Sequence, residues 1–203
     1  VFYSISIGMP TGIAALIVTL QPILTNILSG PILEEKVTSK QWFGVLLGFI
    51  GAGLVLGLEV GTGIPLWGLI ATLIALISIT ASTIWQKKLS GNLPLPVSNF
   101  YQAVGGCVFH LIIIIVFVDP YINFSKTFLI AMSHQIFLVS FGAFTILMYL
   151  IKNNSASKTV SIFFLIPATS AFMAWIFLDE ILTNLDLLGF LITTIGVYIA
   201  TRD

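Results

Sequence analysis

A few side chains within the long apolar stretches of this chain carry hydrogen-bonding groups. Thr19, Pro22 and Asn26 follow one another at spacings of three and four residues, which places them on one face of a helix. Ser82 and Trp85 share a helical face in another stretch. No nucleophile is paired with a base, so these hydroxyl, amide and indole groups indicate reversible binding of a small polar solute rather than covalent catalysis.

Eight residues are candidates for lining such a solute-binding cavity. They carry amides, hydroxyls or rings with a polar edge, and they are Thr19, Asn26, Ser82, Trp85, Tyr101, Gln102, His110 and Tyr149. Alternatively, the small and hydroxyl-bearing residues form helix–helix contacts and satisfy their hydroxyls within their own helices. His110, deep in its apolar stretch, is either a neutral ring bonded to a neighbouring helix or a proton-transfer group.

Neither a metal nor a cofactor is expected. The chain has a single cysteine, Cys107, and two histidines, His110 and His134, without the spacing of metal ligands. The glycine-rich segment 57–63 lacks the Lys-Ser/Thr ending of a phosphate-binding loop, and we interpret it as an external linker.

Two prolines and two glutamates occupy matching positions in different apolar stretches. Pro22 and Pro167 each remove a backbone hydrogen bond in mid-stretch, which predicts a bend that serves as a hinge. Glu35 and Glu180 follow at the ends of the same stretches, where a carboxylate reaches water easily. We therefore interpret both glutamates as stabilisers of turns or helix termini rather than as solute ligands.

The composition is that of a membrane protein. Hydrophobic residues make up 58% of the chain and charged residues 8%, and the mean hydropathy is +1.10. A soluble domain carries about 25% charged residues to cover its surface. The net charge of zero gives no reason to expect nucleic acid as a partner, whereas the lipid bilayer is an expected one.

Seven stretches are long and apolar enough to cross a bilayer, at about 20 residues each. They are approximately Gly12–Leu33, Gln41–Leu58, Leu66–Ile84, Val97–Val118, Ser133–Ile151, Thr159–Leu178 and Leu185–Thr201. Two of them begin with helix-capping signals, Thr38 with Gln41 and Thr183 with Asp186.

The basic residues predict the orientation. Seven of the eight lysines and arginines lie in alternate connections or after the last stretch, and only Lys126 lies on the other side. The positive-inside rule assigns the basic side to the cytoplasm. The expected location is the cytoplasmic (inner) membrane, with the C-terminus cytoplasmic.

The end of the chain repeats its beginning at an offset of 145 residues. Four identities carry the repeat: Pro22 with Pro167, Glu35 with Glu180, Gly44 with Gly189, and Gly51 with Gly196. The predicted topology puts equivalent points of the two copies, such as Glu35 and Glu180, on opposite sides of the membrane, because five spans separate them. The two copies are therefore upside down relative to each other. An inverted repeat of this kind is typical of secondary transporters.

The sequence around these positions resembles the EamA domain. Leu33-Glu34-Glu35 followed by two glycines is similar to the end of one such domain, and Leu178-Asp179-Glu180 to the end of a second. EamA domains form the drug/metabolite transporter superfamily, so the resemblance implies an all-α, polytopic bundle of ten helices in two inverted repeats. About seven complete helices are expected here: residues 1–58 as the end of the first repeat, 59–65 as an external linker and 66–203 as the second repeat. Val1–Ile7 is expected to end a third helix, with earlier spans missing.

The resemblance and the repeat together predict a secondary transporter, not an enzyme. A small metabolite, amino-acid-like or amphiphilic, would bind at the midplane and be exposed to each side alternately. The alternative is a truncated, non-transporting remnant or a membrane-associated helper subunit. A homodimer is possible under either interpretation, through a face that bears Gly44, Gly48, Gly51, Gly189 and Gly196.

Overall fold

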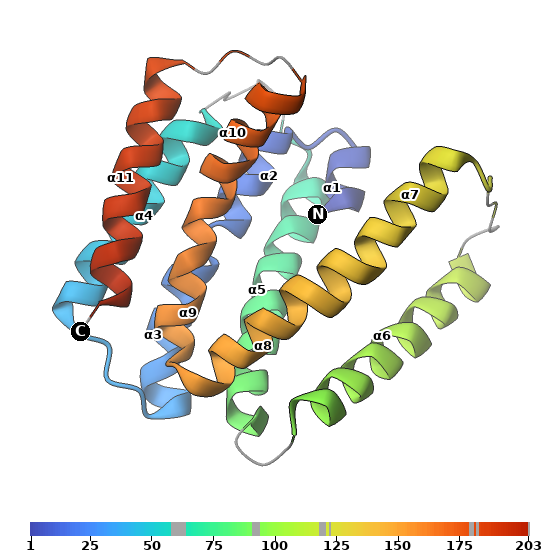
Figure 1. Cartoon of the computed structure of the whole chain (residues 1–203), viewed down its shortest axis with the longest axis horizontal. Helices are drawn as coiled ribbons and strands as arrows, with labels where there is room; N and C mark the ends of the chain where they lie inside the picture. Colours follow the sequence, from blue (N-terminus) through green and yellow to red (C-terminus); the bar gives the residue numbers. More distant parts are fainter. Residues whose placement is uncertain are drawn as a thin grey trace. The chain divides into compact units, whose positions relative to one another are not determined.

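A computed structural model describes residues 1–57, 64–90, 94–117, 121, 123–178, 181 and 183–202. The described chain is helical throughout and divides into two units, residues 1–85 with 154–203 and residues 86–153 (Figure 1). Seven helical stretches among the described residues are long and apolar enough to cross a membrane. The predicted all-α, seven-span membrane fold is therefore confirmed.

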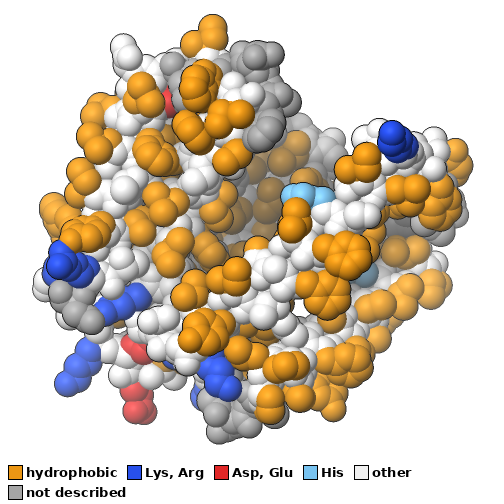
Figure 2. Space-filling model, in the orientation of Figure 1, with side chains coloured by type: hydrophobic (Ala, Val, Ile, Leu, Met, Phe, Trp, Pro, Cys, Tyr) orange, Lys and Arg blue, Asp and Glu red, His pale blue; other side chains and the backbone are white. Residues whose placement is uncertain are grey.

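The first unit contains the spans nearest to both ends of the chain. Its elements are α1 (Phe2–Ser6), α2 (Thr11–Val18), α3 (Gln21–Leu33), α4 (Ser39–Leu56), α5 (Leu66–Ser90) up to Trp85, α9 (Ala156–Ser161), the 3₁₀ turn η2 (Ile162–Phe164), α10 (Leu165–Leu178) and α11 (Asn184–Thr201). Hydrophobic side chains are spread over the visible molecular face, as expected where lipid is the solvent (Figure 2).

Two helices begin with the capping boxes that the sequence predicts. The Thr38 side chain accepts a hydrogen bond from the Gln41 amide at 3.2 Å, and the Gln41 side chain accepts one from the Thr38 amide at 2.8 Å. Thr183 and Asp186 make the same pair of bonds, at 3.2 and 2.8 Å, where α11 begins. Each box satisfies two backbone amides that lack a partner within the helix.

Helices α4 and α11 pack against each other in antiparallel orientation. A Cβ atom added to Gly44 would lie 2.5 Å from the Ala200 nitrogen, and one added to Gly189 would lie 2.7 Å from Cγ2 of Val55. The repeat offset of 145 residues converts Gly44 into Gly189 and Val55 into Ala200. The same contact therefore occurs twice, once at each end of the pair, as an inverted repeat requires.

The glycines of this pair allow the two backbones to approach closely. Gly51 would meet Thr193 and the Gly189 carbonyl if it carried a Cβ, and Gly196 would meet the backbones of Gly44 and Gly48. The glycine-bearing face that was expected to mediate a homodimer is thus occupied within one chain, where α4 and α11 cover each other's glycines, and the homodimer itself stays a prediction. The physical reason is that small residues favour close helix packing without specifying whether the partner helix is in the same chain.

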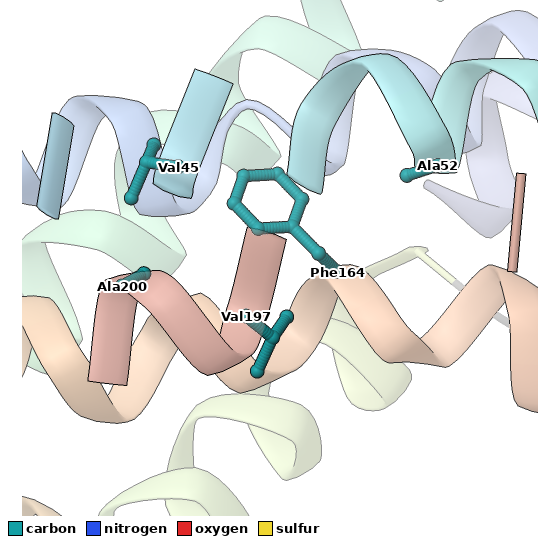
Figure 3. Close-up of a cluster of buried hydrophobic side chains, with 5 residues drawn as sticks. All are labelled: Val45, Ala52, Phe164, Val197 and Ala200. Carbon is teal, nitrogen blue, oxygen red and sulfur yellow. The ribbon is translucent and has the colours of Figure 1, made fainter. Parts of the chain in front are cut away.

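A small apolar core lies beside the α4–α11 contact. Figure 3 shows the ring of Phe164, from η2, between Val45 and Ala52 of α4 and Val197 and Ala200 of α11. All five side chains are buried, and Phe164 is 0% exposed. This ring ties the 3₁₀ turn that precedes α10 to the helix pair.

The second unit is a pair of long helical segments. It contains α6 (Leu95–Phe117) and one continuous span made of α7 (Lys126–His134), the π-helical segment η1 (Gln135–Ala143) and α8 (Phe144–Asn153). This span runs over Lys126–Asn153, so the predicted start at Ser133 is too late. Lys87, at the end of α5, donates to the carbonyl oxygens of Ile151 and Lys152 at 2.9 and 3.3 Å, where a cation suits a helix C-terminus.

Candidate functional site

The spans that contain Pro22 and Pro167 each depart from the regular α-helix shortly before the proline, while the residues that flank the irregular turn stay in the right-handed helical conformation. Helix α2 ends at Val18 and α3 begins at Gln21, so that Pro22 lies in the first turn of α3. In the second copy, η2 interrupts the helix over Ile162–Phe164, and Pro167 lies in the first turn of α10. Proline fits a first helical turn because its missing N–H has no intrahelical acceptor there. The predicted bends are thus breaks that precede each proline by one turn or less.

Helix α3 carries a row of buried polar side chains directly after its break. Gln21 donates from Nε2 to Oγ1 of Thr83 on α5, at 3.1 Å, and Ser29 donates to the Asn26 carbonyl at 3.3 Å. Asn26 is 3% exposed and its Oδ1 accepts a hydrogen bond from the Ser157 hydroxyl of α9. The row therefore joins α3 to two neighbouring helices by side-chain hydrogen bonds.

Two atoms of this row lack a hydrogen-bond partner among the described residues. They are Oγ1 of Thr25, which is 0% exposed, and Nδ2 of Asn26. Buried polar atoms are nearly always paired, so an unpaired amide and hydroxyl mark a place where a polar molecule would gain bonds. Asn26 thus contacts α9 through its side-chain oxygen, while its side-chain N–H group has no partner among the described residues.

Glu35 lies beyond the end of α3, next to the start of α9. Its carboxylate accepts hydrogen bonds from the backbone amides of Ala156 at 2.9 Å and Ser157 at 3.4 Å. These are the first two amides of α9, which lack intrahelical acceptors. Glu180, the matching residue of the second repeat, lies outside the described residues, as does most of the predicted linker 59–65.

For three further candidates of the first unit, the structure describes no hydrogen bond to another helix. Thr19 donates to the Ala15 carbonyl of its own helix at 2.7 Å, while Ser82 and Trp85 are exposed. The buried polar face of α5 is a neighbouring one, which bears Thr72, Thr80 and Thr83 and was not predicted. The four-residue spacing of Gly68, Thr72, Leu76 and Thr80 is the signal that could have indicated this face.

The remaining four candidates belong to the second unit. Tyr101 and Tyr149 are exposed, and Gln102 donates to the Ser98 hydroxyl at 3.5 Å. His110 is exposed, with Nδ1 2.7 Å from the Gly106 carbonyl of its own helix. An interhelical bond that the sequence reasoning missed joins Asn99 Nδ2 of α6 to Thr145 Oγ1 of α8, at 3.2 Å.

The first unit contains an apolar pocket, and the described residues hold no cluster of metal ligands. The cavity has a volume of about 210 Å³ and includes none of the candidate residues, being lined by Val55, Ala168, Ala171, Phe172, Asp186, Leu187 and Phe190. Drug-sized ligands occupy about 300–1,000 Å³ with several converging polar groups. The described part of the chain has no group of three or more His, Cys, Asp or Glu that could hold a metal ion.

The arrangement is that of a helical membrane protein with irregular turns before two prolines that lie 145 residues apart in the sequence. The model of the EamA-like transporter family matches residues 1–57 and 66–202. The chain therefore belongs to the EamA-like transporter family, whose members are transporters rather than enzymes.

Individual relatives agree with this assignment. An uncharacterized transporter of Bacillus subtilis, YvbV, is 27% identical over 200 residues, which cover 93% of this chain and 62% of the relative. A probable amino-acid metabolite efflux pump of Salmonella typhimurium is 25% identical over 208 residues, covering 98% of this chain and 70% of the pump. This chain thus spans less than two thirds of the first relative and somewhat more of the second.

A solved structure has the same fold. The TM-score is 0.81 at 16% sequence identity, and the match covers 98% of this chain and 69% of that one. The likeness extends the fold assignment over nearly the whole chain.

Proposed function

We propose that this chain acts in secondary transport, moving a small metabolite across the cytoplasmic membrane by alternating access. In this proposal, residues 1–58 and 66–203 belong to two inverted repeats joined by residues 59–65. The observation that supports the proposal is the pair of irregular turns before Pro22 and Pro167. In the proposed topology the two copies that contain them have opposite orientations. Irregular turns at equivalent points of the two repeats would let each repeat bend in turn. The bending would expose a central site to one side of the membrane at a time.

The solute class follows from the polar groups that the spans provide. The buried polar side chains of the described residues are hydroxyls and amides: those of Ser, Thr, Asn and Gln. Such groups suit a neutral or zwitterionic solute, because a net charge would need a partner charge in a medium of low dielectric constant. An amino-acid-like metabolite fits this requirement, and one relative carries the name of a probable amino-acid metabolite efflux pump.

Asn26 is the residue that we assign to the solute first. Its unpaired Nδ2 would donate to a solute carboxylate or carbonyl. The unpaired hydroxyl of Thr25, the preceding residue, offers a second polar group. Trp85, Ser82, Thr19, Tyr101, Gln102, His110 and Tyr149 remain candidates for the cavity wall. The lysine-bearing end, with Lys36 and Lys40, is assigned to the cytoplasm together with the C-terminus.

Flux of radiolabelled leucine in membrane vesicles that contain the full chain tests the proposal. We expect saturable flux in the wild type and a loss of at least tenfold in Pro22→Ala, because the helix would then continue through the break. Pro31→Ala is the matched control, since Pro31 lies in the same helix but is exposed, and it should keep wild-type flux. Saturable flux that Pro22→Ala leaves unchanged would contradict the hinge, and absence of flux for any labelled amino acid would favour a helper subunit.

A further inference from the structure

Ser157 is bound to the first repeat through both its backbone and its side chain. The Ser157 amide donates to one carboxylate oxygen of Glu35 at 3.4 Å, and the Ala156 amide donates to the other at 2.9 Å. The Ser157 hydroxyl donates to Oδ1 of Asn26. Three hydrogen bonds thus connect two adjacent residues of α9 to α3 and its end, across more than 120 positions of sequence. We call this set the α3–α9 contact.

The local backbone directs Glu35 toward α9. Helix α3 ends at Leu33, and Glu34 follows in the left-handed conformation with a φ of 58°. The amides of Glu34 and Glu35 donate back to the carbonyls of Gly30 and Ser29, which terminates the helix. The chain therefore turns sharply at Glu34, and Glu35 is the first residue beyond the turn.

The first turn of α9 depends on Glu35 for its capping. The side chain of Ser155, the N-cap residue, accepts a hydrogen bond from the Lys158 amide, at 3.2 Å. The amides of Ala156 and Ser157 are left to the Glu35 carboxylate, whose negative charge also suits the positive end of a helix. The start of the broken span of one repeat is thus completed by a residue of the other repeat.

The α3–α9 contact differs in kind from the α4–α11 contact. Helices α4 and α11 meet backbone to backbone through glycines, and separating them would open an unfilled gap and lose the van der Waals contact between them. The α3–α9 contact consists of a half-buried carboxylate, two backbone amides, a hydroxyl and the side-chain oxygen of Asn26. When the contact opens, water can take the place of the protein partner of each of these groups, so that their hydrogen bonds are exchanged rather than lost.

We propose that the α3–α9 contact is the gate at the lysine-bearing end of the protein, broken each time the pathway opens to that side, while α4–α11 stays closed throughout. This inference rests on the proposed transport function. It assigns Glu35 and Ser157 as positioning residues of alternating access: they determine how long the pathway stays closed at this end and do not select the solute.

Amide hydrogen exchange of the full chain in lipid nanodiscs tests the contact directly. In Glu35→Gln, the Ala156 and Ser157 amides lose a charged acceptor, and we expect their exchange to accelerate about tenfold or more. Exchange in α4 and α11 should not change. Glu34→Gln is the matched control, because Glu34 carries the same charge one position earlier, is exposed, and should leave exchange at wild-type rates. Equal exchange of Ala156 and Ser157 in both variants, or acceleration along the whole chain, would overturn the gate.

A reversible cross-link tests whether the gate must open during transport. Glu35→Cys and Ala156→Cys are combined in a Cys107→Ser background and joined with a short bis-methanethiosulfonate reagent. We expect leucine flux to fall at least tenfold on cross-linking and to return when a reductant is added, with each single cysteine unaffected by the reagent. Flux at the uncross-linked rate through the joined protein would overturn the gate. Absence of flux in the wild type would instead refute the transport function, and the exchange experiment would still decide whether this contact opens separately from α4–α11.

Discussion

The close approach of α4 and α11 gives a quantitative expectation for Gly44→Ala. The added Cβ would lie 2.5 Å from the Ala200 nitrogen and 2.6 Å from the Gly196 oxygen, both backbone atoms that no rotamer change can move. Ordinary contact begins at 3.4 Å, so the helices must separate by about 1 Å. Overpacking of this kind costs about 2–3 kcal/mol, and the better helix propensity of alanine returns about 1 kcal/mol.

The net loss is therefore about 1–2 kcal/mol, which lowers the Tm of a chain of this size by roughly 2–8 °C. Thermal unfolding in detergent, followed by circular dichroism, measures this shift. Gly189→Ala changes the repeat-related position and should lower the Tm by a similar amount. Gly53→Ala is the control on α4, because its Cβ would lie 3.7 Å from Cδ1 of Leu16, and it should leave the Tm unchanged or raise it. A Tm for Gly44→Ala at or above that of Gly53→Ala would refute the backbone-contact argument.

Three further expectations concern stability and are checked by the same unfolding measurement. Thr38→Ala and Thr183→Ala each remove one capping box and should each cost about 1 kcal/mol, with Thr→Ser as the variant that restores the cap. Glu34→Gly should raise stability by about 1 kcal/mol, because glycine adopts the left-handed conformation without the strain of a side chain, and an unchanged or lower Tm would contradict this. Phe164→Ala should cost about 3–5 kcal/mol by emptying the core beside α4 and α11, and a loss under 1 kcal/mol would mean that the helices collapse into the space.

The spans and their capped starts were predictable because their signals are local. Thr38 with Gln41, and Thr183 with Asp186, form their capping boxes from neighbouring residues of the chain. The partner of Asn26 was not predictable, because Ser157 lies 131 positions away and is one of many serines. The π-helical segment of the fifth span has no sequence signature either, since its residues are as apolar as those around it.

The buried face of α5 shows why the sequence of a membrane helix does not reveal which of its faces is buried in the protein. Ser82 and Trp85 belong to a small-and-polar stripe that the structure leaves exposed, while Thr80 and Thr83 are buried. In water, a polar face points outward, but in lipid both the surface and the interior are apolar, so hydropathy does not distinguish them. Threonine adds to the ambiguity because Thr80 satisfies its hydroxyl on its own helix, through the Leu76 carbonyl.

The antiparallel pairing of α4 and α11 also sets an order of events during biosynthesis. About 130 residues separate the two helices, so at 5–20 residues per second the ribosome needs roughly 6–26 s to deliver α11 after α4 has emerged. Throughout that interval the face of α4 that bears Gly44, Gly48 and Gly51 cannot pack against α11, so lipid or an insertion factor must cover it. Helix α11 thus completes the first unit long after α4 is made, and a chain that stops before Asn184 would leave that face open to quality-control proteases.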